Sequence, residues 1–111
     1  MGWVRLDDAI YDHPKFDAVP KPSRWVWICS LAYANRHLTD GFIPSHALRR
    51  INGSSRDAGE LVTAGLWLPD DGGWEIHDYL EHQRSREQIE SERLAIRRRV
   101  DRWRRNGRGH E

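Results

Sequence analysis

The sequence predicts a mainly α-helical fold with a small β-hairpin, in the order of a winged helix-turn-helix, followed by a C-terminal basic helix. Turn residues divide the chain before residue 66 into successive helical segments, and a Gly-rich turn then joins two short strands. Residues 84–105 contain no Gly or Pro and are rich in Arg, and Ser85 with Gln88 or Glu87 is expected to start a long polar helix there. We therefore expect three regions, which are a winged-helix domain at 1–83, a basic amphipathic helix at 84–106 and a disordered end at 107–111.

The first substantial helix is expected at residues 24–37. The segment before it is extended at 3–6, becomes helical after Asp7 and is interrupted by Pro14. Ser23 is expected to cap the helix, because it follows a Pro-rich turn. The apolar residues expected to face the core are Trp27, Ile28, Leu31 and Tyr33 or Ala34, with Trp25 and Cys29 beside them.

Two shorter helices separated by a tight turn come next. A three-residue strand at 42–44 precedes a short helix expected at 45–51. The Asn-Gly pair at 52–53 signals a turn. One of the two serines at 54–55 then caps a third helix, which runs to Ala64. This arrangement holds the third helix so that its first residues can enter a major groove of DNA.

The hairpin is expected at residues 66–77, with strands at 66–68 and 74–77 around a Gly-rich turn. In a winged helix this hairpin is the wing. Asp70 and Asp71 give its tip a negative charge, which phosphates repel. We therefore do not expect the wing to hold the DNA backbone.

Charge is divided sharply along the chain. Residues 1–83 hold eight Lys or Arg against twelve Asp or Glu, whereas residues 84–111 hold ten Arg against five acids. An acidic body with a basic tail is typical of proteins that bind nucleic acid or an acidic partner. In the tail, Ile89, Ile96 and Trp103 recur every seven residues. The tail helix is therefore expected to lie on nucleic acid, or to dock on its own domain or on a second copy.

These patterns define two sets of candidate site residues. The predicted DNA contacts are Arg49, Arg50, Ser54, Ser55, Arg56, Arg93, Arg97, Arg98, Arg99, Arg102, Arg104 and Arg105. The predicted residues for self-association or docking are Ile89, Ile96, Val100 and Trp103.

Other classes of function lack a supporting pattern. His77 and His82 are five residues apart, which does not place them on one helical face, and no Cys pair completes a zinc site. The sequence contains no phosphate-binding Gly loop and no nucleophile motif, so we expect neither an enzyme nor a cofactor. Cys29 is the only cysteine, and no apolar run is long enough to cross a membrane. A cytoplasmic location without membrane contact is expected.

Several runs in the chain resemble a known group of proteins. These runs are GWVRLDDAIYDHPK, YANRHLTDGFIP, AGELVTAGLW and GWEIHDYLEHQRSREQIESER. They are similar to small actinobacterial phage and prophage proteins and to the N-terminal winged-helix domain of DnaD-like phage replisome organisers. The resemblance covers most of residues 1–92 and implies a winged-helix fold, DNA association and self-association. The second domain of replisome organisers has no counterpart in these 111 residues.

The sequence therefore predicts a winged-helix protein that binds double-stranded DNA in replication initiation or in control of transcription or recombination, either as one copy or as a homodimer. The alternative is an interaction module. In that reading, the acidic body and the arginine helix bind a protein of the replication or transcription machinery.

Overall fold

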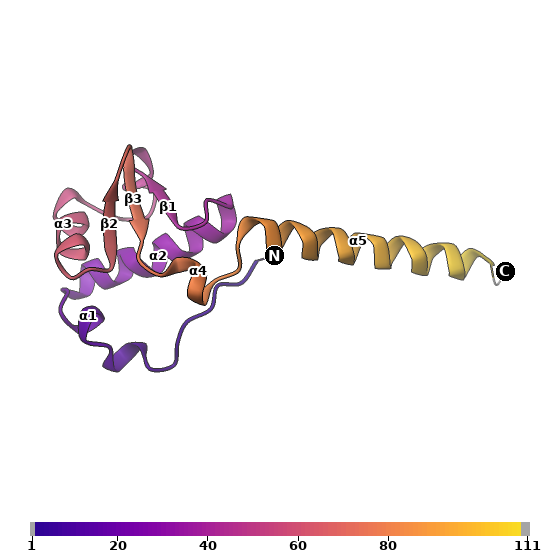
Figure 1. Ribbon diagram of the computed structural model, residues 1–111, viewed down its shortest axis with the longest axis horizontal. Coiled ribbons are helices and arrows are strands. Elements are labelled where there is room, and N and C mark those ends of the chain that lie inside the picture. Colours follow the sequence, from indigo (N-terminus) through magenta and orange to yellow (C-terminus); the bar gives the residue numbers. More distant parts are fainter. Residues whose placement is uncertain (1, 110–111) are drawn as a thin grey trace.

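The computed structural model describes residues 2–109 (Figure 1). It is mainly helical, with a small antiparallel sheet and a long C-terminal helix, as the sequence predicts. Its elements are η1 (Ile10–Asp12), α1 (Pro14–Asp17), α2 (Lys21–His37), β1 (Phe42–Pro44), η2 (Ser45–Ala47), α3 (Ser55–Thr63), β2 (Trp67–Asp70), β3 (Gly73–Ile76), α4 (Tyr79–His82) and α5 (Arg86–Gly109). We call residues 2–85 the body. Figure 1 shows α5 projecting from it as a rod.

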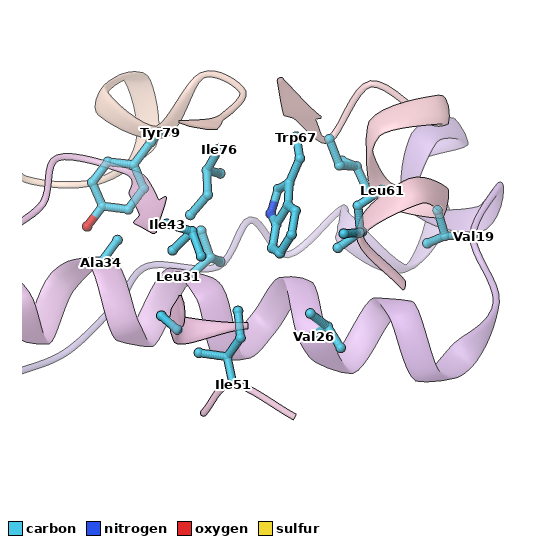
Figure 2. Close-up of a cluster of buried hydrophobic side chains, with 13 residues drawn as sticks. Val19, Val26, Leu31, Ala34, Ile43, Ile51, Leu61, Trp67, Ile76 and Tyr79 are labelled. Atoms are coloured by element: carbon cyan, nitrogen blue, oxygen red, sulfur yellow. The ribbon is translucent and has the colours of Figure 1, made fainter. Parts of the chain in front are cut away.

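The core of the body lies between α2 and the sheet. Val26, Leu31 and Ala34 of α2 are each at most 3% exposed. Trp67 of β2 is fully buried and points toward α2 (Figure 2), where its indole N–H donates to the Ser30 hydroxyl at 3.3 Å. Leu61 of α3 is fully buried in the same cluster and packs α3 against the core.

The sheet has three strands rather than the two of the expected hairpin. Their order is β1-β3-β2, and both pairs are antiparallel. Ile43 of β1 pairs with Trp74 of β3, and Trp67 of β2 pairs with Ile76. Gly73 of β3 is paired with Pro44 of β1, and a Cβ added at Gly73 would be 2.0 Å from the Ile43 carbonyl oxygen. This close approach of the two backbones excludes a larger residue at position 73. The order of elements and this three-stranded sheet are compatible with a winged helix.

The predicted start of the first helix is wrong by three residues. The helix α2 begins at Lys21, with Pro20 at the cap position and Pro22 in the first turn. The first turn of a helix needs no N–H partner, so proline fits there. Ser23 is therefore inside the helix, and its hydroxyl donates instead to Asp57. Pro14 likewise begins the short helix α1 rather than interrupting one.

The buried face of α2 also differs from the expected one. Leu31 and Ala34 are buried as predicted, but Trp25 is 57% exposed and Trp27 and Ile28 are only partly buried. The buried face instead includes Val26 together with the small polar residues Ser23 and Ser30. The serines are buried because each has an internal hydrogen-bond partner.

The predicted helix at 45–51 is a 3-10 turn followed by further turns. Only Ser45–Ala47 is helical. Ile51 is buried in the core, as expected for the inward face of the predicted helix. The chain reverses at Asn52, which has a φ of 66°, and the Gly53 N–H donates to the Leu48 carbonyl at 2.8 Å. A Cβ at Gly53 would lie 2.6 Å from the Leu48 Cδ1 atom and 3.1 Å from the Leu48 carbonyl oxygen, so a larger residue in this turn, which was predicted from the sequence, would require the Leu48 side chain to shift.

The end of the chain is more helical than expected. The short helix α4 precedes α5, and α5 continues to Gly109 instead of ending at 106. Residues 110–111 of the expected disordered end lie outside the described residues. No helix within residues 2–109 is both long enough and apolar enough to cross a membrane.

Candidate nucleic-acid interface

The start of α3 is fixed by an internal network of hydrogen bonds. The Ser54 hydroxyl accepts the Asp57 N–H at 3.2 Å, and an Asp57 carboxylate oxygen accepts the Ser54 N–H at 3.0 Å. This is a capping box. The other oxygen of Asp57 accepts the Ser23 hydroxyl at 2.9 Å, which joins α3 to α2. The predicted cap at 54–55 is confirmed at Ser54.

The Asp57 carboxylate occupies the positive end of α3. Partial burial raises its pKa, but the hydrogen bonds from Ser54 and Ser23 and the charge of Arg56 lower it further, so the net pKa lies below its ordinary value. The carboxylate is therefore ionised at neutral pH, and it accepts the Ser54 N–H at the end of the helix that a phosphate would otherwise approach. Ser54 consequently positions the helix and is not a free donor for DNA.

The other predicted residues of this segment face the solvent. Arg49, Arg50, Ser55 and Arg56 are all exposed, the first two in the turns before α3 and the others in its first turn. The guanidinium groups of the three arginines form no ion pair with any described carboxylate. The structure therefore leaves these side chains available to a ligand.

One residue of α3 that the sequence analysis missed is Gly59. It is exposed, and a Cβ built there would have no atom within 4 Å. Glycine inside a helix costs about 1 kcal/mol relative to alanine, and nothing within the fold requires it here. Gly59 lies four residues after Ser55 and four before the exposed Thr63, so these residues form one smooth outer face. The spacing of four residues between Ser55, Gly59 and Thr63 is visible in the sequence and could have predicted this face.

The hairpin tip has the predicted negative charge. Gly72 adopts a φ of 79° at the turn, and Asp70 and Asp71 are both exposed. The Gly72 carbonyl accepts the Ser45 N–H at 2.9 Å, which places the tip next to η2. Any anion approaching this end of the body therefore meets two carboxylates.

The base of α5 is anchored to the body. The Ser85 hydroxyl accepts the Gln88 N–H, and the Gln88 side chain accepts the Ser85 N–H, as the predicted cap requires. The Arg86 N–H donates to Asp40 at 2.5 Å, and Ile89 is only 6% exposed. Arg84 pairs with Glu92, and Arg86 with Glu90 at 3.0 Å. These contacts fix the direction in which α5 leaves the body.

Beyond its base, α5 carries seven predicted arginines, all of them exposed. None of the seven forms an ion pair within the described part of the chain. We call Ile89, Ile96, Val100 and Trp103 the apolar stripe. At about 3.6 residues per turn, Arg98, Arg102 and Arg105 lie on the face opposite this stripe. The remaining four, Arg93, Arg97, Arg99 and Arg104, flank the stripe.

The structure separates the predicted docking residues into two groups. Ile89 is buried at the base of α5, whereas Ile96, Val100 and Trp103 are 56%, 41% and 74% exposed. Leu94, which the sequence analysis did not select, is 44% exposed on another face. The stripe is therefore continuous along the helix but covered only at one end.

A second feature is a cavity of about 130 Å³ under the N-terminal segment. The Gln83 side chain holds this segment by accepting the Arg5 N–H at 2.9 Å and donating to the Arg5 carbonyl at 2.5 Å. Trp27 lines the cavity, and its buried indole N–H has no hydrogen-bond partner among the described residues. No group of three or more metal-ligating side chains occurs within residues 2–109, and His77 contacts Asp78 at 3.0 Å.

No protein-family model matches this chain, and neither a curated protein nor a solved structure is significantly similar to it.

Proposed function

We propose that the protein binds double-stranded DNA as a winged-helix module whose arginine helix supplies most of the affinity. The observation that carries the proposal is the group of seven exposed arginines without ion-pair partners on α5. Guanidinium groups on a helix that is anchored at its base are well placed to neutralise phosphates. The resemblance of the sequence to phage proteins supports a role in replication initiation or in control of transcription or recombination.

The start of α3 is the proposed second contact. Arg49, Arg50 and Arg56 are exposed there, and the outer face at Ser55 and Gly59 has no bulky side chain. A smooth helix face lets a helix approach a groove closely, and the three arginines flank it. The acidic hairpin tip takes no part, because Asp70 and Asp71 repel phosphates.

The test is direct binding of the full chain to a labelled duplex of mixed sequence at about 50 mM salt, where non-specific contacts are strong. The proposal predicts saturable binding that weakens as salt rises. No binding to any duplex under these conditions contradicts it.

A second candidate function is docking to a protein of the replication or transcription machinery. The exposed carboxylates of the hairpin tip and the Asp57 carboxylate at the start of α3 favour it, because both disfavour DNA at those points. The variant Arg49→Gln with Arg56→Gln separates the two. If DNA affinity does not change in this variant while the helix arginines still matter, α3 faces a protein and not a groove.

A further inference from the structure

The outer part of α5 has an apolar face that nothing in the described chain covers. Ile96, Val100 and Trp103 project on the same side as Ile89, because spacings of three, four and seven residues return to one face of a helix. Ile89 is 6% exposed against the body, whereas the other three are 41% to 74% exposed. DNA contacts made by arginines do not account for this face.

We propose that this face pairs with the α5 helix of a second copy of the chain, and that the two helices run antiparallel with Ile96 at the centre. This self-association goes beyond DNA binding and does not depend on it. The pair is isologous, so both copies use the same residues.

The charge distribution along α5 sets the antiparallel direction. Residues 86–92 hold three Glu and one Arg, whereas residues 93–105 hold seven Arg and one acid, Asp101. Parallel helices would place the Arg-rich ends side by side, and like charges in contact are destabilising. Antiparallel helices place the Arg-rich end of each copy beside the Glu-rich base of the other.

The spacing of the stripe sets the register. Ile89 and Trp103 each lie seven residues from Ile96, so a two-fold axis at Ile96 brings Trp103 of one copy level with Ile89 of the other. In the same register the Glu-rich base of one copy is level with the Arg-rich tip of the other. The apolar positions therefore match in a single arrangement.

The base of α5 is a suitable surface for the tip of the second helix. A shallow depression beside α4 is lined by Asp40, Glu75, Asp78 and Glu81 and by no Lys or Arg. Asp40 also accepts the Arg86 N–H, so this acidic surface adjoins the start of α5. In the antiparallel pair, the arginines at the tip of one copy approach these carboxylates of the other.

The residues that the structure describes cannot fold back to cover the stripe. Residues 84–105 contain no Gly or Pro at which the helix would bend. At about 1.5 Å per residue, Trp103 lies about 21 Å beyond Ile89 along the axis. The pairing leaves Arg98, Arg102 and Arg105 largely on the outside, so DNA binding and self-association use different faces.

Cysteine cross-linking tests the direction and the register. In the background Cys29→Ser, the variant Ile96→Cys is expected to form a disulfide-linked dimer under mild oxidation. The variant Trp103→Cys is not expected to do so, because the two copies of residue 103 are about 21 Å apart in the antiparallel pair. Arg98→Cys, on the opposite face, is the matched control. Equal cross-linking of all three variants, or none at residue 96, overturns the proposal.

Sedimentation velocity of the full chain without DNA tests the apolar contact. The wild type is expected to pass from monomer to dimer as its concentration rises. Ile96→Ser removes two central side chains per dimer and is expected to raise the dissociation constant at least about tenfold. Leu94→Ser, a similar loss on another face, is expected to leave it unchanged. A wild type that stays monomeric, or equal effects of the two variants, contradicts the proposal, and far-UV circular dichroism establishes that both variants are folded.

Discussion

The body and the helix α5 differ in how far their side chains are buried. In the body, Ile43, Leu61 and Trp67 are fully buried, and even the serines of α2 have internal hydrogen-bond partners. In α5, every residue from 90 to 106 is exposed. The body therefore owes its structure to packing, whereas α5 is held only at its base and presents charged and apolar groups to other molecules. The function that we propose for each region follows from this difference.

The largest expected effect on stability comes from a substitution in the core of the body. Trp67→Ala removes a fully buried indole between α2 and the sheet, and it is expected to lower the free energy of unfolding by about 3–5 kcal/mol. Trp103→Ala removes the same side chain from α5, where it is 74% exposed, and is expected to change that free energy by less than about 0.5 kcal/mol. Urea unfolding followed by far-UV circular dichroism measures both. At a concentration at which the chain is monomeric, comparable losses would mean that α5 packs on the body.

A second pair of variants compares hydroxyl groups in the two regions. Ser30→Ala leaves the buried Trp67 N–H without its acceptor and is expected to cost about 1–3 kcal/mol. Ser91→Ala on exposed α5 is expected to be neutral or to stabilise by a few tenths of a kcal/mol, because alanine has the higher helix propensity. The same unfolding measurement distinguishes them, and a neutral Ser30→Ala would show that the Trp67 N–H finds another partner.

The cap of α3 predicts a pH-dependent effect. Asp57→Asn is expected to cost about 1 kcal/mol at neutral pH by weakening the capping box. The folded-state pKa of Asp57 lies below its ordinary value of 3.8, so its contribution is complete above that pH and is lost as the pH falls through the folded-state pKa. The stability difference from wild type should therefore shrink as the pH falls below 3.8. Asp71→Asn at the exposed hairpin tip is the control, and a pH-independent difference would contradict this assignment.

The exposed glycine of α3 gives a smaller effect in which stability and binding change in opposite directions. Gly59→Ala is expected to stabilise the body by about 1 kcal/mol, since its Cβ meets no atom within 4 Å. If α3 enters a groove, the same methyl group should weaken DNA binding. Stabilisation without any loss of duplex affinity would remove α3 from the proposed contact surface.

Local patterns predicted the parts of the fold that depend on local contacts. The Asn52-Gly53 turn, the Ser54 cap and the Ser85 cap are each formed by residues close together in the sequence, and each was predicted from the sequence. Ser23 was assigned to the wrong role because its partner, Asp57, lies 34 residues away. The pairing of β1 with β3 was missed for the same reason, because the sequence of a three-residue strand does not indicate which distant strand it pairs with.

The candidate site was predicted to a similar degree. The predicted arginines of α5 are exposed on one long helix, as the sequence indicated. The roles of neighbouring residues depend on tertiary contacts. Ile89 and Ile96 occupy equivalent positions in the seven-residue repeat, yet one is buried and the other exposed, because only the first reaches the body. Ser54 had the right residue type for a DNA contact, but its hydroxyl is already committed to Asp57.

The most direct test of the central claim is the salt dependence of duplex affinity for the wild type and for Arg98→Gln/Arg102→Gln/Arg105→Gln. If about six arginines neutralise phosphates, wild-type affinity falls about a thousandfold between about 50 and 200 mM salt. The triple variant is expected to reduce the slope of log affinity against log salt by about three. An unchanged slope in this variant would contradict the claim that α5 holds the DNA backbone.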